Sequence, residues 1–112
     1  MIDINPLRNW NVSNGNNFSY FFSGCSHLID IEPLNNWNVS KGEIFSCMFG
    51  ICSNLWDIKP LEKWNLSNGK DFKGMFGECS SLLNFNVLKN PGKNCFYDKL
   101  SKDFNKRVLR VS

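Results

Sequence analysis

The stretch Ile31–Asp57, with the sequence IEPLNNWNVSKGEIFSCMFGICSNLWD, has a close copy before it and another after it. Alignment on the tryptophans sets the copies 27 residues apart, as units 4–30, 31–57 and 58–84, and a partial fourth unit starts at residue 85. A fixed period of this length is typical of proteins whose units stack, because one unit alone cannot bury its apolar face. Residues 1–88 are therefore predicted to form one tandem-repeat domain.

Four apolar columns recur in the three units. They are Trp10, Trp37 and Trp64; Phe22, Phe49 and Phe76; Cys25, Cys52 and Cys79; and Leu28, Leu55 and Leu82. Because one position of successive units lines up when units stack, we predict that these columns face the core. Cysteines that recur at the repeat period favour a core column over a disulfide framework, and the total of five cysteines is odd.

The second part of each unit has the hydrophobic spacing of a helix. Apolar residues fall at i, i+3, i+4 and i+7, which is one face of a helix of about two turns. In the second unit these residues are Phe45, Met48, Phe49 and Cys52. A glycine precedes this segment in every unit, Gly42 in the second, and suits a turn with positive φ. We predict a glycine turn followed by a short helix.

Two other segments of each unit alternate between apolar and polar residues, as a strand does. In the second unit they are Trp37–Val39 and the step Trp56–Ile58, in which Asp57 is expected to point outward. The fold class predicted from these periods is an α/β repeat. Each 27-residue coil would then contain short parallel strands and a short helix.

Positive charge is concentrated at the C-terminal end of the chain. The chain has 112 residues and a net charge of +3, yet it has six Lys and Arg against eight Asp and Glu up to Leu88, and seven against two after it. Residues 89–112 are interpreted as a basic terminal helix that caps the last coil. A basic arm that binds nucleic acid or an acidic membrane, or a disordered tail, is the alternative.

The sequence lacks the residue patterns of catalytic and metal sites. His27 is the only histidine, and its column holds Asn54 and Ser81 in the other units. No second histidine or C-x-x-C spacing is present to complete a metal site, and no repeated base accompanies the serines and cysteines. We predict that the protein is not an enzyme and binds no cofactor or metal.

Two polar columns are the candidate outward binding face. They are Asp30 and Asp57, preceded by Asp3, and Asn11, Asn38 and Asn65. Aligned carboxylates repel one another unless a cation, a basic ligand or local amides offset the charge. One interpretation is therefore a stripe that recruits Ca²⁺ or a basic partner. The other is solvated residues that bond to the local backbone and stabilise the stack.

The order of these columns resembles the BspA-like leucine-rich repeats, the bacterial surface protein 26-residue repeat. The resemblance covers about residues 1–88 and rests on Met-Phe or Phe-Phe, Cys-Ser-x-Leu, Ile-x-x-Leu and Trp-Asn-x-Ser, although each unit is one residue longer. It implies a right-handed leucine-rich-repeat-like solenoid, a surface or secreted location and a role in adhesion or protein binding. It transfers no catalytic residue, and the chain as given begins without a signal peptide or lipid anchor.

The predicted function is a non-enzymatic repeat scaffold for protein–protein or adhesin-like interaction, complete or as a piece of a longer surface array. The expected partner is a protein or a glycan, and edge-to-edge self-association of coils is a further expectation. The alternative is binding of nucleic acid or an acidic membrane by the basic tail.

Overall fold

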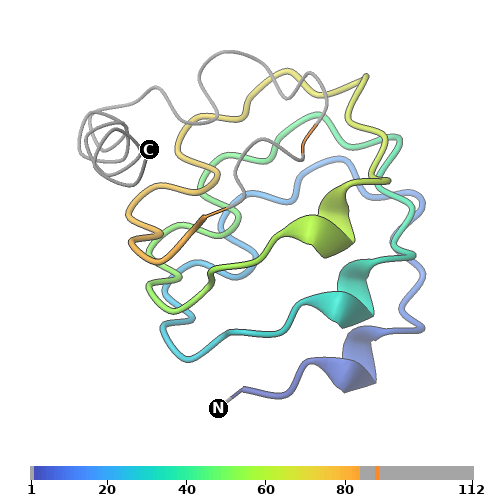
Figure 1. Cartoon of the computed structure of the whole chain (residues 1–112). Coiled ribbons are helices and arrows are strands. Elements are labelled where there is room, and N and C mark those ends of the chain that lie inside the picture. The colour runs from blue at the N-terminus through green and yellow to red at the C-terminus, as the bar shows by residue number, and fades with distance from the viewer. Residues whose placement is uncertain (1, 84–87, 89–112) are drawn as a thin grey trace.

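The Ile-x-Pro-Leu step of each unit winds into a short 3-10 helix. In this computed structural model, which describes residues 2–83 and residue 88, the helices are η1 (Asn5–Leu7), η2 (Glu32–Leu34) and η3 (Lys59–Leu61). Each has a proline in its first turn, where the missing N–H would have had no helical partner. Figure 1 shows the three helices one above another along one side of the molecule.

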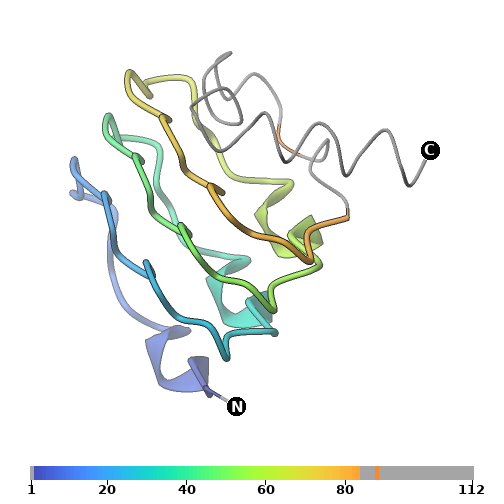
Figure 2. The ribbon, with the colours of Figure 1, turned by 90° about the vertical axis from the view of Figure 1, so that its left-hand side faces the viewer.

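Equivalent residues of successive units lie side by side. Single parallel bridges join Asn17 to Ile44 and Ile44 to Asp71. The Phe18 N–H donates to the Ile44 carbonyl at 2.7 Å, and the Phe45 N–H donates to the Asp71 carbonyl at the same distance. Figure 2 shows the resulting arrangement, in which three turns of the chain follow one another with the same path.

Over residues 18–24 and 45–51 the backbone hydrogen bonds between units run in one direction, whereas the amides of Glu43 and Ile44, just before the second segment, donate the opposite way to the Asn16 carbonyl. Four N–H groups of the first unit, at Phe18, Tyr20, Phe22 and Gly24, donate to carbonyls of the second unit over 2.7 to 3.1 Å. The second unit donates to the third in the same way, from Phe45, Cys47, Phe49 and Ile51. In these two segments, four peptide groups of the middle unit therefore accept from the unit before it and donate to the unit after it.

The predicted short helix does not form in the described units. Over Phe45–Cys52 the amides alternate between bonds to the next unit and local i to i+3 turns, instead of bonding the carbonyl four residues back. The alternation requires left-handed residues, Cys47 at φ 55° and Ile51 at φ 61°. Phe45, Met48, Phe49 and Cys52 are nevertheless fully buried, so the spacing identified the apolar face and misidentified the backbone.

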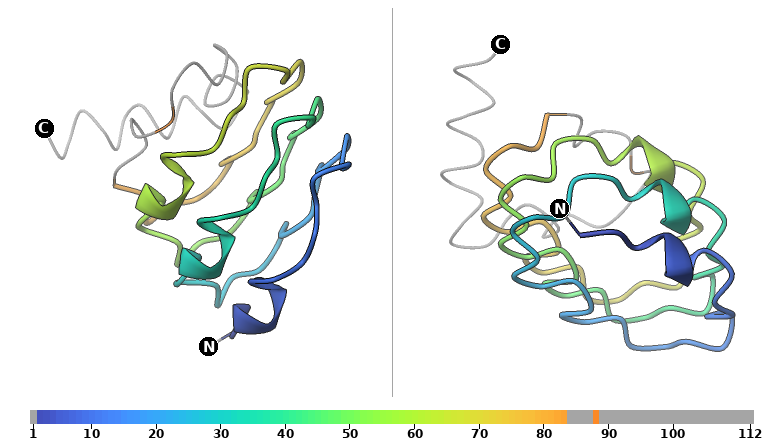
Figure 3. Two further views of the ribbon diagram at one scale, coloured as in Figure 1. Left: turned by 90° about the vertical axis from the view of Figure 1, so that its right-hand side faces the viewer. Right: turned by 90° about the horizontal axis from the view of Figure 1, so that it is seen from below.

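The predicted strands are also absent from residues 2–83, where the only ladder pairs are the two single bridges. The alternation predicted around Asp57 is wrong as well, because Trp56 is exposed while Leu55 and Ile58 are buried. The described part of the chain is thus a compact body with almost no regular secondary structure. Figure 3 shows loops and short helices, with no arrows, along the whole of this part.

Stacked aromatic rings fill the core. One ladder consists of Phe18, Phe45 and Phe72, with ring centroids 5.5 and 5.3 Å apart. The other consists of Phe22, Phe49 and Phe76, with centroids 5.3 and 5.4 Å apart and nearly parallel planes. Because equivalent rings of neighbouring units meet face to face, each unit completes the core of the next.

The first unit departs from the predicted core columns at two positions. Trp37 and Trp64 are buried, and their indole N–H groups donate to the carbonyls of Leu7 and Leu34 in the preceding unit. Trp10 is exposed, and Cys25 is half-buried whereas Cys52 and Cys79 are fully buried. The equivalent side chains of the later units pack against the unit before them. The structure describes no unit before the first, so Trp10 and Cys25 lack this contact.

The recurring glycine is required by a neighbouring ring and not by its own φ, which corrects the prediction. Gly42 is outside the left-handed region, and a Cβ there would lie 2.4 Å from Cζ of Phe45 and 3.0 Å from the Val39 carbonyl oxygen. Gly15 and Gly69 meet Phe18 and Phe72 in the same way. The glycine column therefore makes room for one aromatic ladder.

Replacing Ile51 with glycine is expected to raise the free energy of unfolding by about 1 kcal/mol, because a left-handed non-glycine residue costs roughly 1 to 2 kcal/mol. Ile51 is half-exposed at φ 61°, so little packing is lost. The matched variant is Gly24→Ala in the first unit, where φ is 78° and space is open, and it should be destabilised. Urea denaturation checks both, and a destabilised Ile51→Gly protein would contradict the strain.

The partial fourth unit from residue 85 and the basic segment 89–112 lie outside the described residues, except Leu88, which is buried. The predictions for the tail are therefore unchanged. Among the described helices, none has the length and apolar character needed to cross a membrane.

Candidate binding site

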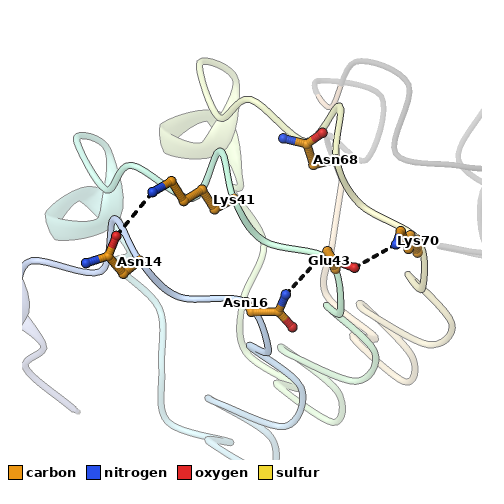
Figure 4. A pocket seen from close by; sticks show the side chains of 6 residues that line it. All are labelled: Asn14, Asn16, Lys41, Glu43, Asn68 and Lys70. Carbon is orange, nitrogen blue, oxygen red and sulfur yellow. Dashed lines mark hydrogen bonds and ion pairs between the residues drawn. The ribbon is translucent and has the colours of Figure 1, made fainter.

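Six polar side chains from the three units line a pocket of about 400 Å³. They form two columns, Asn14, Lys41 and Asn68, and Asn16, Glu43 and Lys70. Figure 4 shows the two columns on consecutive turns of the chain, with their side chains at the surface. Among the residues that the structure describes, no apolar one lines the pocket.

The glycine turn of each unit positions these side chains. In the second unit the Gly42 N–H donates to the Val39 carbonyl at 2.8 Å, which closes a tight turn with Lys41 just before the glycine and Glu43 just after it. The equivalent turns close at Gly15 and Gly69. Because the turns stack, each unit adds one residue to each column.

Hydrogen bonds across the pocket connect all three units. Asn16 Nδ2 donates to Glu43 Oε2 at 2.6 Å, and Lys70 Nζ lies 2.8 Å from Glu43 Oε1. Lys41 Nζ donates to Asn14 Oδ1 over a longer distance of 3.3 Å. Asn68 Nδ2 donates to the Ser40 carbonyl at 2.7 Å.

The charges of the pocket are fixed near neutral pH. The hydrogen bond from Lys70, followed by the one from Asn16, lowers the pKa of Glu43, and the bond to Glu43 raises the pKa of Lys70. Glu43 and Lys70 therefore form an ion pair, whereas Lys41 donates to the neutral amide of Asn14. Among the described lining residues, the Lys41 ammonium and the asparagine amides can meet hydroxyl or carboxylate groups of a partner.

The described units match a known sequence family. A family model described as "Mycoplasma protein of unknown function, DUF285" matches residues 2–90. The chain belongs to the DUF285 family. The match covers all three units and every residue of the pocket. No curated protein matches the chain, and no solved structure does. This match does not confirm the BspA-like name that the resemblance suggested.

The predicted outward columns of this DUF285 protein bond to their own backbone. Oδ1 of Asp30 and of Asp57 each accepts the N–H two residues further on at 2.9 Å. Asn11, Asn38 and Asn65 accept the amides of the serines that follow by two. These columns stabilise local turns, and none of them lines the pocket.

No three His, Cys, Asp or Glu side chains gather as a metal site within the described part of the DUF285 chain. His27 is exposed, at some distance in sequence from every pocket residue.

Two surface features were missed from the sequence. The pocket columns were overlooked because their residue types vary between amide, lysine and glutamate, although every unit has a polar residue there. The second feature is a column of exposed apolar residues in the segments that the sequence predicts to be strands with buried apolar residues. It consists of Ile2, Ile29, Trp56 and Leu83, which are 37% to 60% exposed.

Cys52 is expected to resist alkylation in the folded DUF285 chain. Burial, followed by the charge of Cys25, raises the pKa of the Cys52 thiol from 9.0 to about 12. The thiol is therefore protonated at about pH 8, where iodoacetamide needs a thiolate. The pKa of this thiol is higher in the folded state than in the unfolded state, so the protonated thiol favours folding. This contribution to the free energy of unfolding is lost as pH rises from 9 toward 12. Mass spectrometry of alkylated native and urea-unfolded protein checks the prediction, and equal labelling would contradict it.

Proposed function

We propose that this DUF285 chain is a non-enzymatic binding module whose polar pocket binds a glycan or a polar protein surface. One observation carries the proposal, the convergence of six polar side chains from three successive units on a single open pocket. Its volume of about 400 Å³ is in the range of small-ligand sites. The purely polar lining favours a partner that is recognised by hydrogen bonds.

The pocket is suited to hydroxyl and carboxylate groups. Lysine presents three donors, and each asparagine amide presents donors and an acceptor. Lys41 has the weakest partner in the pocket, so it can exchange the Asn14 amide for an acceptor of the ligand at small cost. Glu43 already accepts from two neighbours and mainly holds the two columns together.

We also propose that the chain is a right-handed solenoid of the leucine-rich-repeat type, on which the pocket is one segment of a longer surface. Support comes from the recurrence of contacts at the same sequence separation. The tryptophan bond from Trp37 to Leu7 is repeated from Trp64 to Leu34, and each spans 30 residues. Such scaffolds present equivalent surface positions side by side, which is how repeat proteins build binding faces.

A double variant, Lys41→Ala with Asn68→Ala, should bind the partner at least tenfold more weakly, because each substitution removes donors that face the pocket. The test is a glycan array together with a panel of purified surface proteins, followed by titration of every partner found. Lys63→Ala is the matched control, since Lys63 is exposed and lies outside the pocket. Equal affinity of the double variant and the Lys63→Ala protein for every partner would contradict the proposal.

A further inference from the structure

The edge of the first unit that faces away from the second ends in a row of carbonyl groups. They belong to Asn17, Ser19, Phe21 and Ser23. At the equivalent positions of the second unit, Ile44, Ser46, Met48 and Gly50, each carbonyl accepts an N–H from the unit before it. Within the described residues, no N–H donates to the four carbonyls of the first unit.

Two aromatic side chains beside this row, Trp10 and Phe21, are exposed in the first unit, whereas their equivalents in the later units are buried. Trp10 is 53% exposed, whereas Trp37 and Trp64 are 4% and 6% exposed. Phe21 is 41% exposed, and its equivalent Met48 is fully buried. Trp10 meets Phe21 edge to face with ring centroids 6.5 Å apart, so the two rings form one aromatic surface.

Two donors of the first unit also lack the acceptor that their equivalents use. The Trp37 indole donates to the Leu7 carbonyl of the preceding unit at 3.0 Å, and the Cys52 thiol donates to the Phe22 carbonyl at 3.2 Å. No described carbonyl accepts from the Trp10 indole or the Cys25 thiol. The first unit therefore presents the same donors, acceptors and apolar groups that the second unit uses to contact the first.

The direction of the hydrogen bonds restricts what can cover this edge. Peptide dipoles that align along a hydrogen-bonded column leave partial negative charge at the carbonyl end, as at the C-terminus of a helix. Two copies of this row of four carbonyls would therefore repel each other face to face. A matching partner must present N–H groups at alternate residues, as the first unit itself does toward the second.

We infer that the first-unit edge is a docking site for a further unit of the same 27-residue pattern. The argument is continuity with the interface between the first and second units, because the four carbonyls, the Trp10 indole and the Cys25 thiol have equivalents in the second unit that bond to the first unit. This docking is independent of the polar pocket and would extend the stack in one direction only. The incoming unit would cover Trp10 and Phe21 and donate to the four carbonyls.

The test is a chain in which a copy of residues 31–57 precedes Ile4, joined in the register of the natural units and followed by residues 4–112. Trp10 is expected to be oxidised by N-bromosuccinimide at least tenfold more slowly in the extended chain than in the original, as mapped by mass spectrometry. The control extension has the same length but carries serine at the copied positions of Phe45, Met48 and Phe49, and should leave Trp10 reactive.

Unchanged oxidation of Trp10 in the extended chain, or an extended chain that does not fold, would overturn the inference. Sedimentation of the original chain provides a second test, because repulsion between carbonyl edges predicts that two copies do not pair through this surface. A dimer that Trp10→Asp converts to monomer would also overturn it. A chain whose sedimentation is unchanged by Trp10→Asp supports it.

Discussion

Truncating Phe45 to alanine is expected to lower the free energy of unfolding by about 3 to 5 kcal/mol, the usual cost of removing a buried phenylalanine ring. Phe45 is fully buried and stands between Phe18 and Phe72, with ring centroids 5.5 and 5.3 Å away. Its loss therefore removes two ring contacts and leaves a cavity that both neighbouring units line. Urea denaturation followed by circular dichroism measures the change.

The matched control for Phe45→Ala is Leu83→Ala. Leu83 is also a large apolar residue, but it is 60% exposed, so its truncation should change stability by no more than about 0.5 kcal/mol. A Phe45→Ala protein as stable as the Leu83→Ala protein would mean that the stacked ladder is not part of the folded core.

Replacing Gly42 with alanine is expected to destabilise the protein by about 1 to 3 kcal/mol, the cost of forcing an extra methyl into a packed site. The new Cβ would lie 2.4 Å from Cζ of Phe45, and the Val39 carbonyl oxygen at 3.0 Å blocks movement on the other side. Because the ring is held between two others, it cannot turn away without disturbing the ladder. The same denaturation experiment measures this loss.

A double-mutant cycle distinguishes this collision from a general effect of alanine in the turn. In the Phe45→Ala background the ring is absent, so Gly42→Ala should cost much less than in the original chain, and the two changes should be non-additive. Full additivity would show that Gly42 is needed for some reason other than the Phe45 ring. Gly24→Ala, where no atom lies within 4 Å, should be additive with Phe45→Ala.

The apolar core could be predicted from spacing because burial depends on which residues recur, and not on the backbone conformation that connects them. Phe45, Met48, Phe49 and Cys52 are all buried as their spacing indicates. The same spacing fits a helix, and it also fits a chain whose amides alternate between local turns and hydrogen bonds to the next unit. The left-handed residues that decide between the two, Cys47 and Ile51, are not types that favour this conformation.

The candidate site was harder to predict, because it is formed by residues 27 positions apart whose chemistry changes from unit to unit. Lys41 replaces an asparagine, and Glu43 stands between Asn16 and Lys70 across the pocket. The aspartate and asparagine columns drew attention because they are constant. Their constancy reflects the local turn that each one caps, since Asp57 and Asn38 both accept the amide two residues ahead.

The contacts between units join each unit to its immediate neighbours, at sequence separations of 24 to 30 residues for side chains such as Arg8 with Glu32 and Trp64 with Leu34. A gene that gains or loses a stretch of 27 codons therefore encodes a chain in which every remaining junction is of a kind already present. Length can thus vary in whole units during inheritance without any new interface having to evolve.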